Sequence, residues 1–251
     1  MLARLVMAAM LLVTSLAFAD EAQRVAEATA LCEKVETARR ALDKDALAAL
    51  LPKVAPLHNA LDDEAARKRL QGTLGDVLDA DDLAVSTRTA AADVLAELHD
   101  ERVWAQLKRE WPLPDVEAAT PIQVRVVAAA GKIAAPASAD QLIDLLKRGR
   151  DPNLVETSLS ALAGFGWAKN RVSVLDALGS TIPLVEGGGA GGGRGGKTSP
   201  ETAALWRRLG PLLLTSLNTL TGRSELTLEA WSALLKENRR RLESLFLRER
   251  S

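Results

Sequence analysis

The sequence contains no tyrosine, one cysteine and two histidines, and aromatic residues make up only 3% of its 251 positions. A lone cysteine, Cys32, cannot form an intramolecular disulfide. Neither His58 nor His99 has a second histidine or a cysteine at metal-ligand spacing, so we expect no metal site. The net charge is −1, and this balance provides no general attraction to nucleic acid or to a membrane surface.

The common catalytic patterns are missing as well. The chain has no Ser-His-Asp arrangement, no nucleophile elbow and no cysteine pair. Asp79, Asp81 and Asp82 form an acidic run without the glycine and distal glutamate of a calcium loop, which favours a solvated, helix-capping turn. Cys32 stands at helical spacing among apolar residues, as a small core residue does. We therefore expect no catalytic, cofactor-binding or metal-binding residues, and a protein that is not an enzyme.

One stretch does match a nucleotide-binding motif. Gly191–Thr198 fits G-x-x-x-x-G-K-[ST], the loop that surrounds phosphate groups in many ATPases and GTPases. Such a loop needs a buried strand before it and a helix directly after it. Pro183 interrupts the preceding apolar segment, and the next helix is expected to begin only at Pro200, with Ser199 as its cap. Because eight of the ten residues 187–196 are glycine, we interpret the segment 183–199 as a disordered, flexible loop and expect no nucleotide.

Residues 1–19 have the three parts of a secretory signal peptide. Arg4 precedes an uncharged apolar stretch that ends in the small-x-small sequence Ala17-Phe18-Ala19. The stretch is shorter than the roughly 18 apolar residues that a spanning helix needs. We expect cleavage before Asp20, export to the periplasm or the extracellular medium, and no stable membrane insertion of the mature chain.

The remaining sequence predicts helices. Alanine and leucine dominate it, and both residues favour helical conformation. Apolar residues recur at three- and four-residue steps in segments 21–42, 44–57 and 63–78, and Pro52 and Pro56 are expected to kink or divide the second segment. Valine and isoleucine are scattered at helical spacing rather than in alternating runs. The predicted fold class is therefore all-α.

Local signals mark several helix ends. Asp62–Asp63 offer N-caps for the third of these helices, and Asp151 with the proline after it predicts another helix start. Gly149 stands where the preceding helix is expected to stop, and Asn170 can cap the next helix. The connector Trp111–Asp115 contains two prolines, which do not allow a helix to continue.

Three stretches that follow Asp81 can be laid over one another. Each has an alanine-rich helix, a short turn and a second helix with apolar residues on one side. Ala92–Leu95 aligns with Ala130–Ile133 at an offset of 38, and the latter aligns with Ala163–Gly166 at an offset of 33. Periods in the thirties with helix–turn–helix content are typical of an α-solenoid, a stack of antiparallel helix pairs.

These stretches resemble degenerate HEAT-type repeats. The likeness begins near Lys44 or Asp81 and ends near Leu178. The C-terminal region is similar to the ending of exported HEAT-repeat proteins of certain bacteria, in which an L-T-G turn precedes a tryptophan-containing helix that ends in E-N. Leu220–Gly222, Trp231 and Glu237–Asn238 carry that likeness, although residues 233–235 lack the further tryptophans of those relatives. The resemblance implies an armadillo-type superhelix and an exported location, but no activity.

Acidic and basic residues are distributed unevenly along the chain. Residues 20–100 contain 17 acidic and 10 basic residues, a net charge of −7, whereas residues 197–251 contain 10 basic and 6 acidic, a net charge of +4. Such asymmetry can orient a partner, or the arginines of the C-terminal helix (Arg239–Arg241, Arg248, Arg250) can simply form a solvated face opposite an apolar stripe.

The tryptophans are expected to be core or inter-repeat anchors: Trp104, Trp111, Trp167, Trp206 and Trp231.

The sequence thus predicts five segments. They are a signal peptide (1–19), N-terminal helices forming a degenerate repeat or cap (20–80), HEAT-like repeats (81–182), a glycine-rich flexible loop (183–199) and a C-terminal helix pair or cap (200–251). A solenoid presents a long continuous surface, so we expect an exported, non-catalytic scaffold that binds a protein partner. The alternatives are a self-assembling structural subunit of the cell envelope and a hydrolase whose site no motif reveals.

Overall fold

The computed structural model describes residues 2–98, 100–186, 200–223 and 226–246, with side chains except at 2–18 and 200–203. Every regular element in these ranges is a helix and none is a strand, which confirms the predicted all-α class. Contacts divide the chain into two compact units, Met1–His99 and Asp100–Ser251. This division falls within the segment 81–182. Of the helices described, none is both long enough and apolar enough to cross a membrane.

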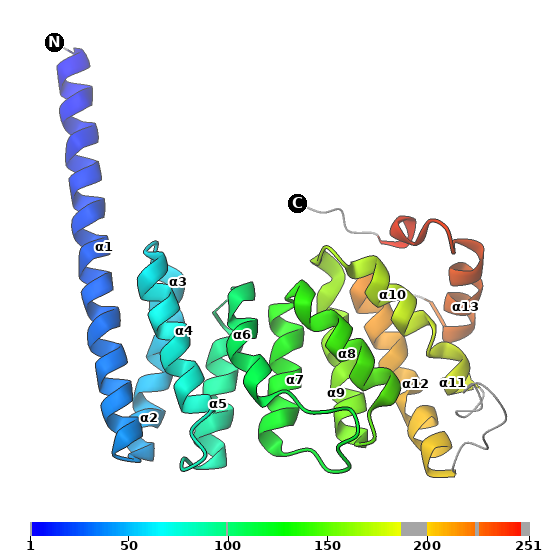
Figure 1. Ribbon diagram of the computed structural model, residues 1–251. Helices are drawn as coiled ribbons and strands as arrows, with labels where there is room; N and C mark the ends of the chain where they lie inside the picture. The colour runs from blue at the N-terminus through cyan, green and yellow to red at the C-terminus, as the bar shows by residue number, and fades with distance from the viewer. Residues whose placement is uncertain (1, 99, 187–199, 224–225, 247–251) are drawn as a thin grey trace. The chain divides into compact units, whose positions relative to one another are not determined.

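The first unit begins with its longest helix (Figure 1). Its elements are α1 (Leu2–Arg40), α2 (Lys44–Leu50), the 3-10 turn η1 (Leu51–Lys53), α3 (Val54–Ala60), α4 (Glu64–Leu78) and α5 (Val85–Ala96). Helix α1 packs against α2, α3 and α4, and α5 packs against α4 and α2. The unit is therefore held together by contacts that link its first helix to segments about 40 residues further along the chain.

Capping carboxylates set the starts of these helices. The Asp43 carboxylate accepts a hydrogen bond from the Ala46 N–H at 2.9 Å, and the Asp63 carboxylate accepts one from the Ala66 N–H at 2.7 Å. Each bond satisfies an N–H that has no partner inside the first helical turn. The Asp63 cap confirms the prediction, and η1 divides the segment at Pro52 as expected.

The core of the first unit consists of the apolar residues at the predicted helical steps. Cys32 is among them, with 3% of its surface exposed. The main core side chains are Leu31, Val35, Leu47, Leu51, Val54, Leu70, Leu74, Val77 and Leu78. Most of these are leucine or valine, so burial of aliphatic surface stabilises this unit without any aromatic residue in that set.

The second unit contains a longer series of helices. Its elements are η2 (Glu101–Val103), α6 (Trp104–Leu107), η3 (Lys108–Glu110), α7 (Pro121–Ile133), α8 (Pro136–Arg148), α9 (Pro152–Leu162), η4 (Ala163–Trp167), α10 (Arg171–Gly179), α11 (Ile182–Glu186), α12 (Pro200–Thr221), α13 (Leu228–Glu237) and η5 (Leu242–Leu245). Helix α9 packs against α7, α8 and α12, and α10 packs against α8, α12 and α13. Successive helices therefore cover each other's apolar faces.

Asp151 shows how a local cap also fixes a distant loop. Its carboxylate accepts hydrogen bonds from the N–H groups of Asn153 at 2.7 Å and Leu154 at 3.0 Å, and Pro152 occupies the first helical position, as predicted. The second carboxylate oxygen accepts from the Ala119 N–H at 2.9 Å. One buried side chain therefore starts α9 and holds the connector that leads into α7.

Other helix ends differ in how closely they match expectation. Gly149 follows the last residue of α8, as predicted. Thr120 and Gln123 form a capping box at α7, which the sequence analysis missed. Asn170 occupies the N-cap position of α10 but makes no cap bond. Its amide donates instead to the Pro136 carbonyl at 3.1 Å, so it connects α10 to the start of α8.

Glycines allow close backbone approach in the second unit. A Cβ added to Gly131 would lie 2.4 Å from the Ala161 Cα, and one added to Gly164 would lie 2.2 Å from the Gly131 carbonyl oxygen. Both distances are far below van der Waals contact, so a larger residue would force the helices apart. Gly131 and Gly164 are also the positions that the sequence alignment pairs at an offset of 33.

The C-terminal helix is shorter than predicted. Helix α13 ends at Glu237, and the Asn238 side-chain amide donates to the Leu234 carbonyl at 2.9 Å. Arg239–Arg241 form a turn, so their predicted place on a helix is wrong. The Asn238 side chain occupies a terminal carbonyl, as asparagine often does at helix ends, and three adjacent arginines repel one another. The predicted apolar stripe consists of Leu234, Leu235, Leu242, Leu245 and Phe246, and of these only Leu245 is buried.

The segment before the glycine run is helical. Residues Ile182–Glu186 form α11, so the predicted loop 183–199 begins inside a helix. Pro183 is compatible with this because the first turn of a helix needs no N–H from it. Helix α12 begins at Pro200 as predicted. Gly191–Thr198 and Ser199 lie outside the described residues.

We expect Gly164→Ala to destabilise the protein by about 1–3 kcal/mol, the usual cost of overpacking, because its Cβ would meet the Gly131 carbonyl. Gly72→Ala is the matched control, since a Cβ at Gly72 has no atom within 4 Å. In the interior of α4 it should stabilise the protein by about 0.5–1 kcal/mol. Urea denaturation followed by circular dichroism measures both. Equal, small effects would contradict the close approach.

Candidate functional site

Of the two histidines, His58 alone lies within the described residues. His99 lies outside the described residues. His58 is buried, with the Gln71 amide nitrogen 3.0 Å from its Nε2 and the Asn59 amide oxygen 3.1 Å from its Nδ1. This arrangement suits a neutral ring that carries its proton on Nδ1. His58 therefore sits among amide side chains inside the first unit, where it serves packing.

The acidic run is a turn, as expected, but it does not cap α5. Asp79 follows the last residue of α4, and the Asp81 carboxylate accepts a hydrogen bond from Arg88 at 2.8 Å. Arg88 is buried and also donates to the Leu78 carbonyl at 2.6 Å. No group of three or more His, Cys, Asp or Glu side chains suited to a metal ion occurs within the described residues.

The tryptophans have different roles. Trp104, Trp206 and Trp231 are buried, in agreement with the prediction, whereas Trp167 is 53% exposed. Trp104 packs edge-on against Trp111, with ring centroids 4.9 Å apart. The exposure of Trp167 contradicts its predicted position in the core.

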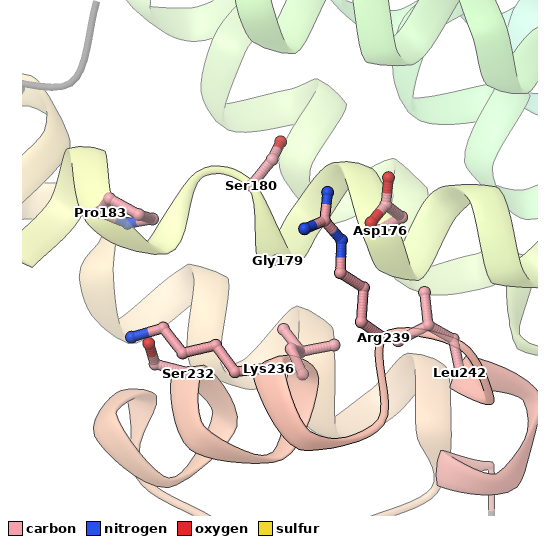
Figure 2. Close-up of a pocket in the computed structure, with 9 residues that line it drawn as sticks. Asp176, Gly179, Ser180, Pro183, Ser232, Lys236, Arg239 and Leu242 are labelled. Atoms are coloured by element: carbon pink, nitrogen blue, oxygen red, sulfur yellow. The ribbon is translucent and has the colours of Figure 1, made fainter.

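A cleft of about 240 Å³ opens between α10 and α13 (Figure 2). Helix α10, α11, α13, the turn after α13 and η5 all contribute to it. Its lining combines apolar, hydroxyl and charged side chains: Pro183, Leu235 and Leu242; Ser180 and Ser232; Asp176, Lys236 and Arg239. Apolar walls with a few convergent polar groups are the usual composition of a binding site. The volume is below the roughly 300–1,000 Å³ of typical small-molecule pockets, so it suits one or two side chains.

Two contacts position α13 next to this cleft. Gly179 allows α13 to approach α10, because a Cβ there would lie 2.5 Å from a terminal methyl group of Leu235. Trp231 is fully buried, and its indole N–H donates to the Asn218 side-chain oxygen on α12 at 2.9 Å. These contacts hold α13 in place beside α10.

Two arginines anchor η5 below the turn. Arg171 is buried, donates to the Glu243 carboxylate with its Nε at 3.0 Å and places its guanidinium 4.5 Å from the centre of the Phe246 ring. Arg223 donates to the Leu245 carbonyl at 2.8 Å. Both ends of the turn Arg239–Arg241 are therefore fixed, by α13 before it and by η5 after it.

Unlike Arg171 and Arg223, the basic residues in and beside the turn do not anchor η5. Arg239 reaches from the turn toward α10, and Asp176 lies on the opposite wall (Figure 2). Within the described residues, no hydrogen bond or ion pair is formed by the side chains of Lys236, Arg239, Arg240 and Arg241. The sequence analysis noted these arginines but assigned them to a helix, and it could not foresee the cleft because Pro183 and Leu242 are far apart in the chain.

A second hollow lies between α1 and α2 and is lined mainly by alanines, with Glu33, Lys34 and Asp43 also along it. Its volume is about 570 Å³. Small apolar side chains offer a ligand no directional contact, and its charged residues carry both signs. The cleft between α10 and α13 is therefore the better candidate site.

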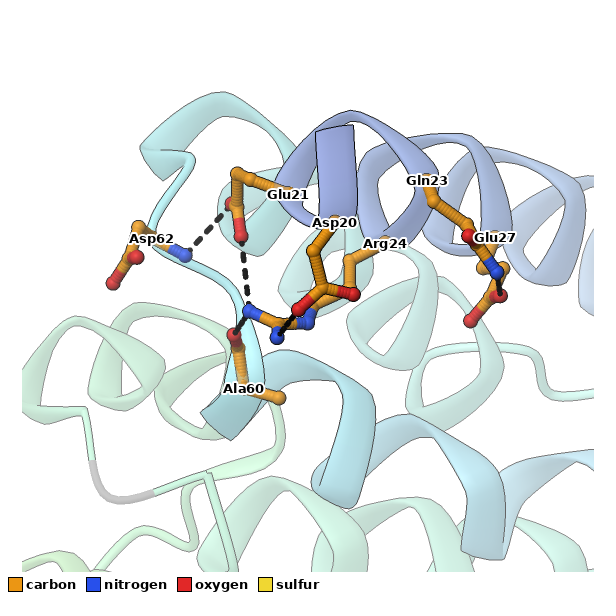
Figure 3. A network of polar contacts seen from close by, with 7 residues as sticks. All are labelled: Asp20, Glu21, Gln23, Arg24, Glu27, Ala60 and Asp62. Atoms are coloured by element: carbon orange, nitrogen blue, oxygen red, sulfur yellow. Dashed lines mark hydrogen bonds and ion pairs between the residues drawn. The ribbon is translucent and has the colours of Figure 1, made fainter. Parts of the chain in front are cut away.

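A polar network joins the part of α1 that begins at Asp20 to other segments of the first unit (Figure 3). Glu21 accepts hydrogen bonds from the N–H groups of Asp62 at 2.8 Å and Asp63 at 2.9 Å. Arg24 donates to the Ala60 carbonyl at 3.1 Å and pairs with Asp20. The backbone N–H of Asp63, followed by that of Asp62 and the positive charge of Arg24, lowers the pKa of Glu21, and these effects outweigh the desolvation that raises it. The network begins at the predicted cleavage point.

Comparison of the chain with family models, curated proteins and solved structures gave no match.

We expect Cys32 to react with a thiol reagent only after unfolding. Burial raises the pKa of its thiol above the ordinary value, so the native side chain keeps its proton at neutral pH. A neutral thiol with a raised folded-state pKa stabilises the fold fully below the ordinary pKa, and this stability is lost as the pH rises through the raised value. Wild type should therefore lose more thermal stability than Cys32→Ala between about pH 7 and 10. Rapid labelling of the native thiol would contradict its burial.

Glu21→Gln should lower the melting temperature at neutral pH. The carboxylate has a lowered pKa when folded, so its contribution is present above the ordinary value of 4.5 and disappears as the pH falls through the lowered one. The difference between wild type and variant should thus shrink in acid. Glu27→Gln is the control, because Glu27 accepts one side-chain bond, from Gln23 at 3.1 Å. A difference that persists unchanged at low pH would show that charge is not responsible.

Proposed function

We propose that this protein is an exported, non-catalytic scaffold that binds another protein through a stack of HEAT-like helix pairs. The observation that carries the proposal is the contact between Gly131 and Gly164. These residues are equivalent in the repeat alignment, and they touch in space. Equivalent positions of successive repeats meet in this way when the repeats are stacked.

The order of helix contacts supports stacked pairs in the second unit. Helix α7 contacts α9, and α9 contacts α12. Likewise, α8 contacts α10, and α10 contacts α13. These contacts give two rows of helices, α7, α9 and α12 in one and α8, α10 and α13 in the other, which is the arrangement expected of an α-solenoid. The Ser216 hydroxyl donates to the Leu159 carbonyl at 3.1 Å, and Arg208 pairs with Glu156 at 3.1 Å, so polar contacts join α12 to α9 within the first row.

The C-terminal likeness to exported HEAT-repeat proteins also has local support. Gly222 adopts a φ of 78°, a left-handed conformation that glycine tolerates best, directly after α12. Trp231 is the buried anchor of α13, and Asn238 ends that helix. The L-T-G, tryptophan and E-N positions therefore each have a structural role.

Export is supported by the place where the polar network begins. Asp20, Glu21 and Arg24 form contacts within the first unit, so a chain cleaved before Asp20 retains every one of them. Cleavage at Ala19 is thus compatible with the fold. Destination in the periplasm or the medium remains part of the proposal.

The experiment has two readouts in the native cell. Mass spectrometry of the purified protein should find an N-terminus at Asp20, and retention of residues 1–19 would overturn export by a cleaved signal.

A photo-crosslinking residue is then placed at exposed positions of each row, at Lys147 and Ser173 for α8 and α10, and at Ser160 and Thr215 for α9 and α12. A scaffold should yield one discrete heterologous adduct from one row and little from the other. Adducts with a second copy would favour the self-assembling subunit, and no adduct from either row would contradict the scaffold.

A further inference from the structure

Four cations are concentrated at one end of the second unit. Lys236, Arg239, Arg240 and Arg241 fall within six consecutive positions, are exposed, and have Glu237 as the acidic residue among them. They line a shallow hollow of about 520 Å³ next to the cleft between α10 and α13. Like charges this close repel one another, so an anionic partner would relieve an existing electrostatic cost.

The carboxylates that lie near these four cations do not neutralise them. Glu243 is used by the buried Arg171, and Asp176 forms no ion pair with Arg239 within the described structure. The turn is fixed by Arg171 and Arg223 through η5. Cations that are positioned but not neutralised are available to a ligand, and they need little reorganisation to bind it.

The cleft beside these cations also favours an apolar group on the ligand. Leu235, Leu242 and Pro183 form its apolar walls, and its volume of about 240 Å³ accommodates a side chain. The Ser180 and Ser232 hydroxyls can donate or accept hydrogen bonds. A ligand that fits both features carries a negative group next to an apolar group.

We propose that the cleft between α10 and α13, together with the basic turn, binds an acidic segment of a partner protein. A partner carboxylate pairs with Arg239 and Lys236, and the apolar side chain beside it enters the cleft between Leu235 and Leu242. This inference rests on the proposed scaffold function and names its docking site and the chemistry of its partner.

Asp176 favours a peptide over a nucleic acid or a phosphate-rich surface. Its carboxylate lies on the wall opposite Lys236 (Figure 2). A dense row of phosphates would be repelled by it, because phosphates only accept hydrogen bonds and carry negative charge throughout. A peptide backbone supplies N–H groups that a carboxylate can accept, in addition to acidic side chains.

The test uses the full chain and a fluorescein-labelled peptide of alternating Glu and Leu, with fluorescence anisotropy as the readout. Lys236→Gln/Arg239→Gln should weaken binding about tenfold at low salt, because the variant removes two exposed ion pairs with the peptide. Lys132→Gln/Lys147→Gln removes the same charge from exposed sites on α7 and α8 and should change affinity less than about twofold. A peptide with Gln in place of Glu should not bind.

Equal losses in both double variants would assign binding to general attraction and overturn the site. Binding of the Gln peptide, or stronger binding of a single-stranded oligonucleotide than of the acidic peptide, would overturn the partner chemistry. Self-association of the wild type that the Lys236→Gln/Arg239→Gln variant loses would assign the cleft to a second copy. If the peptide fails to bind while a discrete crosslinked partner persists in cells, the docking site is wrong and the scaffold function stands.

Discussion

The close approach of backbones around Gly131 and Gly164 is the constraint on which the second unit depends. An alanine-rich amphipathic helix buries little surface by itself, so it must lie close to its neighbours to be stable. Glycine at these positions lets α7 and the segment after α9 meet backbone to backbone. Gly166 repeats the device toward α12, where a Cβ would lie 2.7 Å from the Leu220 carbonyl oxygen. Close backbone contacts at glycines thus recur between α7, the segment after α9 and α12.

The same tight packing accounts for the candidate site. Because α13 is anchored by Trp231 and η5 by Arg171, the turn between them has little freedom to fold back. Its arginines are therefore presented to solvent beside the apolar walls of the cleft. The proposed docking site therefore lies at this end of the described helix series, beside α13.

Much of the fold could be predicted from short-range signals. The Asp63 and Asp151 caps, the break at Pro52 and the end at Gly149 each follow from interactions within a few residues, and such interactions are legible in sequence. The errors occurred where long-range contacts decide. Asn170 bonds to Pro136 instead of capping its own helix. The sequence analysis made no prediction for Arg171, because its partner Glu243 lies 72 residues further along the chain. The cleft joins segments about 60 residues apart, so no local pattern announces it.

Native-state hydrogen–deuterium exchange tests the stacked arrangement most directly. Helix α9 is covered by α7, α8 and α12, whereas α13 packs mainly on α10. If each helix depends on its neighbours for protection, the amides of α9 should exchange slowest in the second unit and those of α13 much faster. Exchange of α9 as fast as that of α13 would contradict the account.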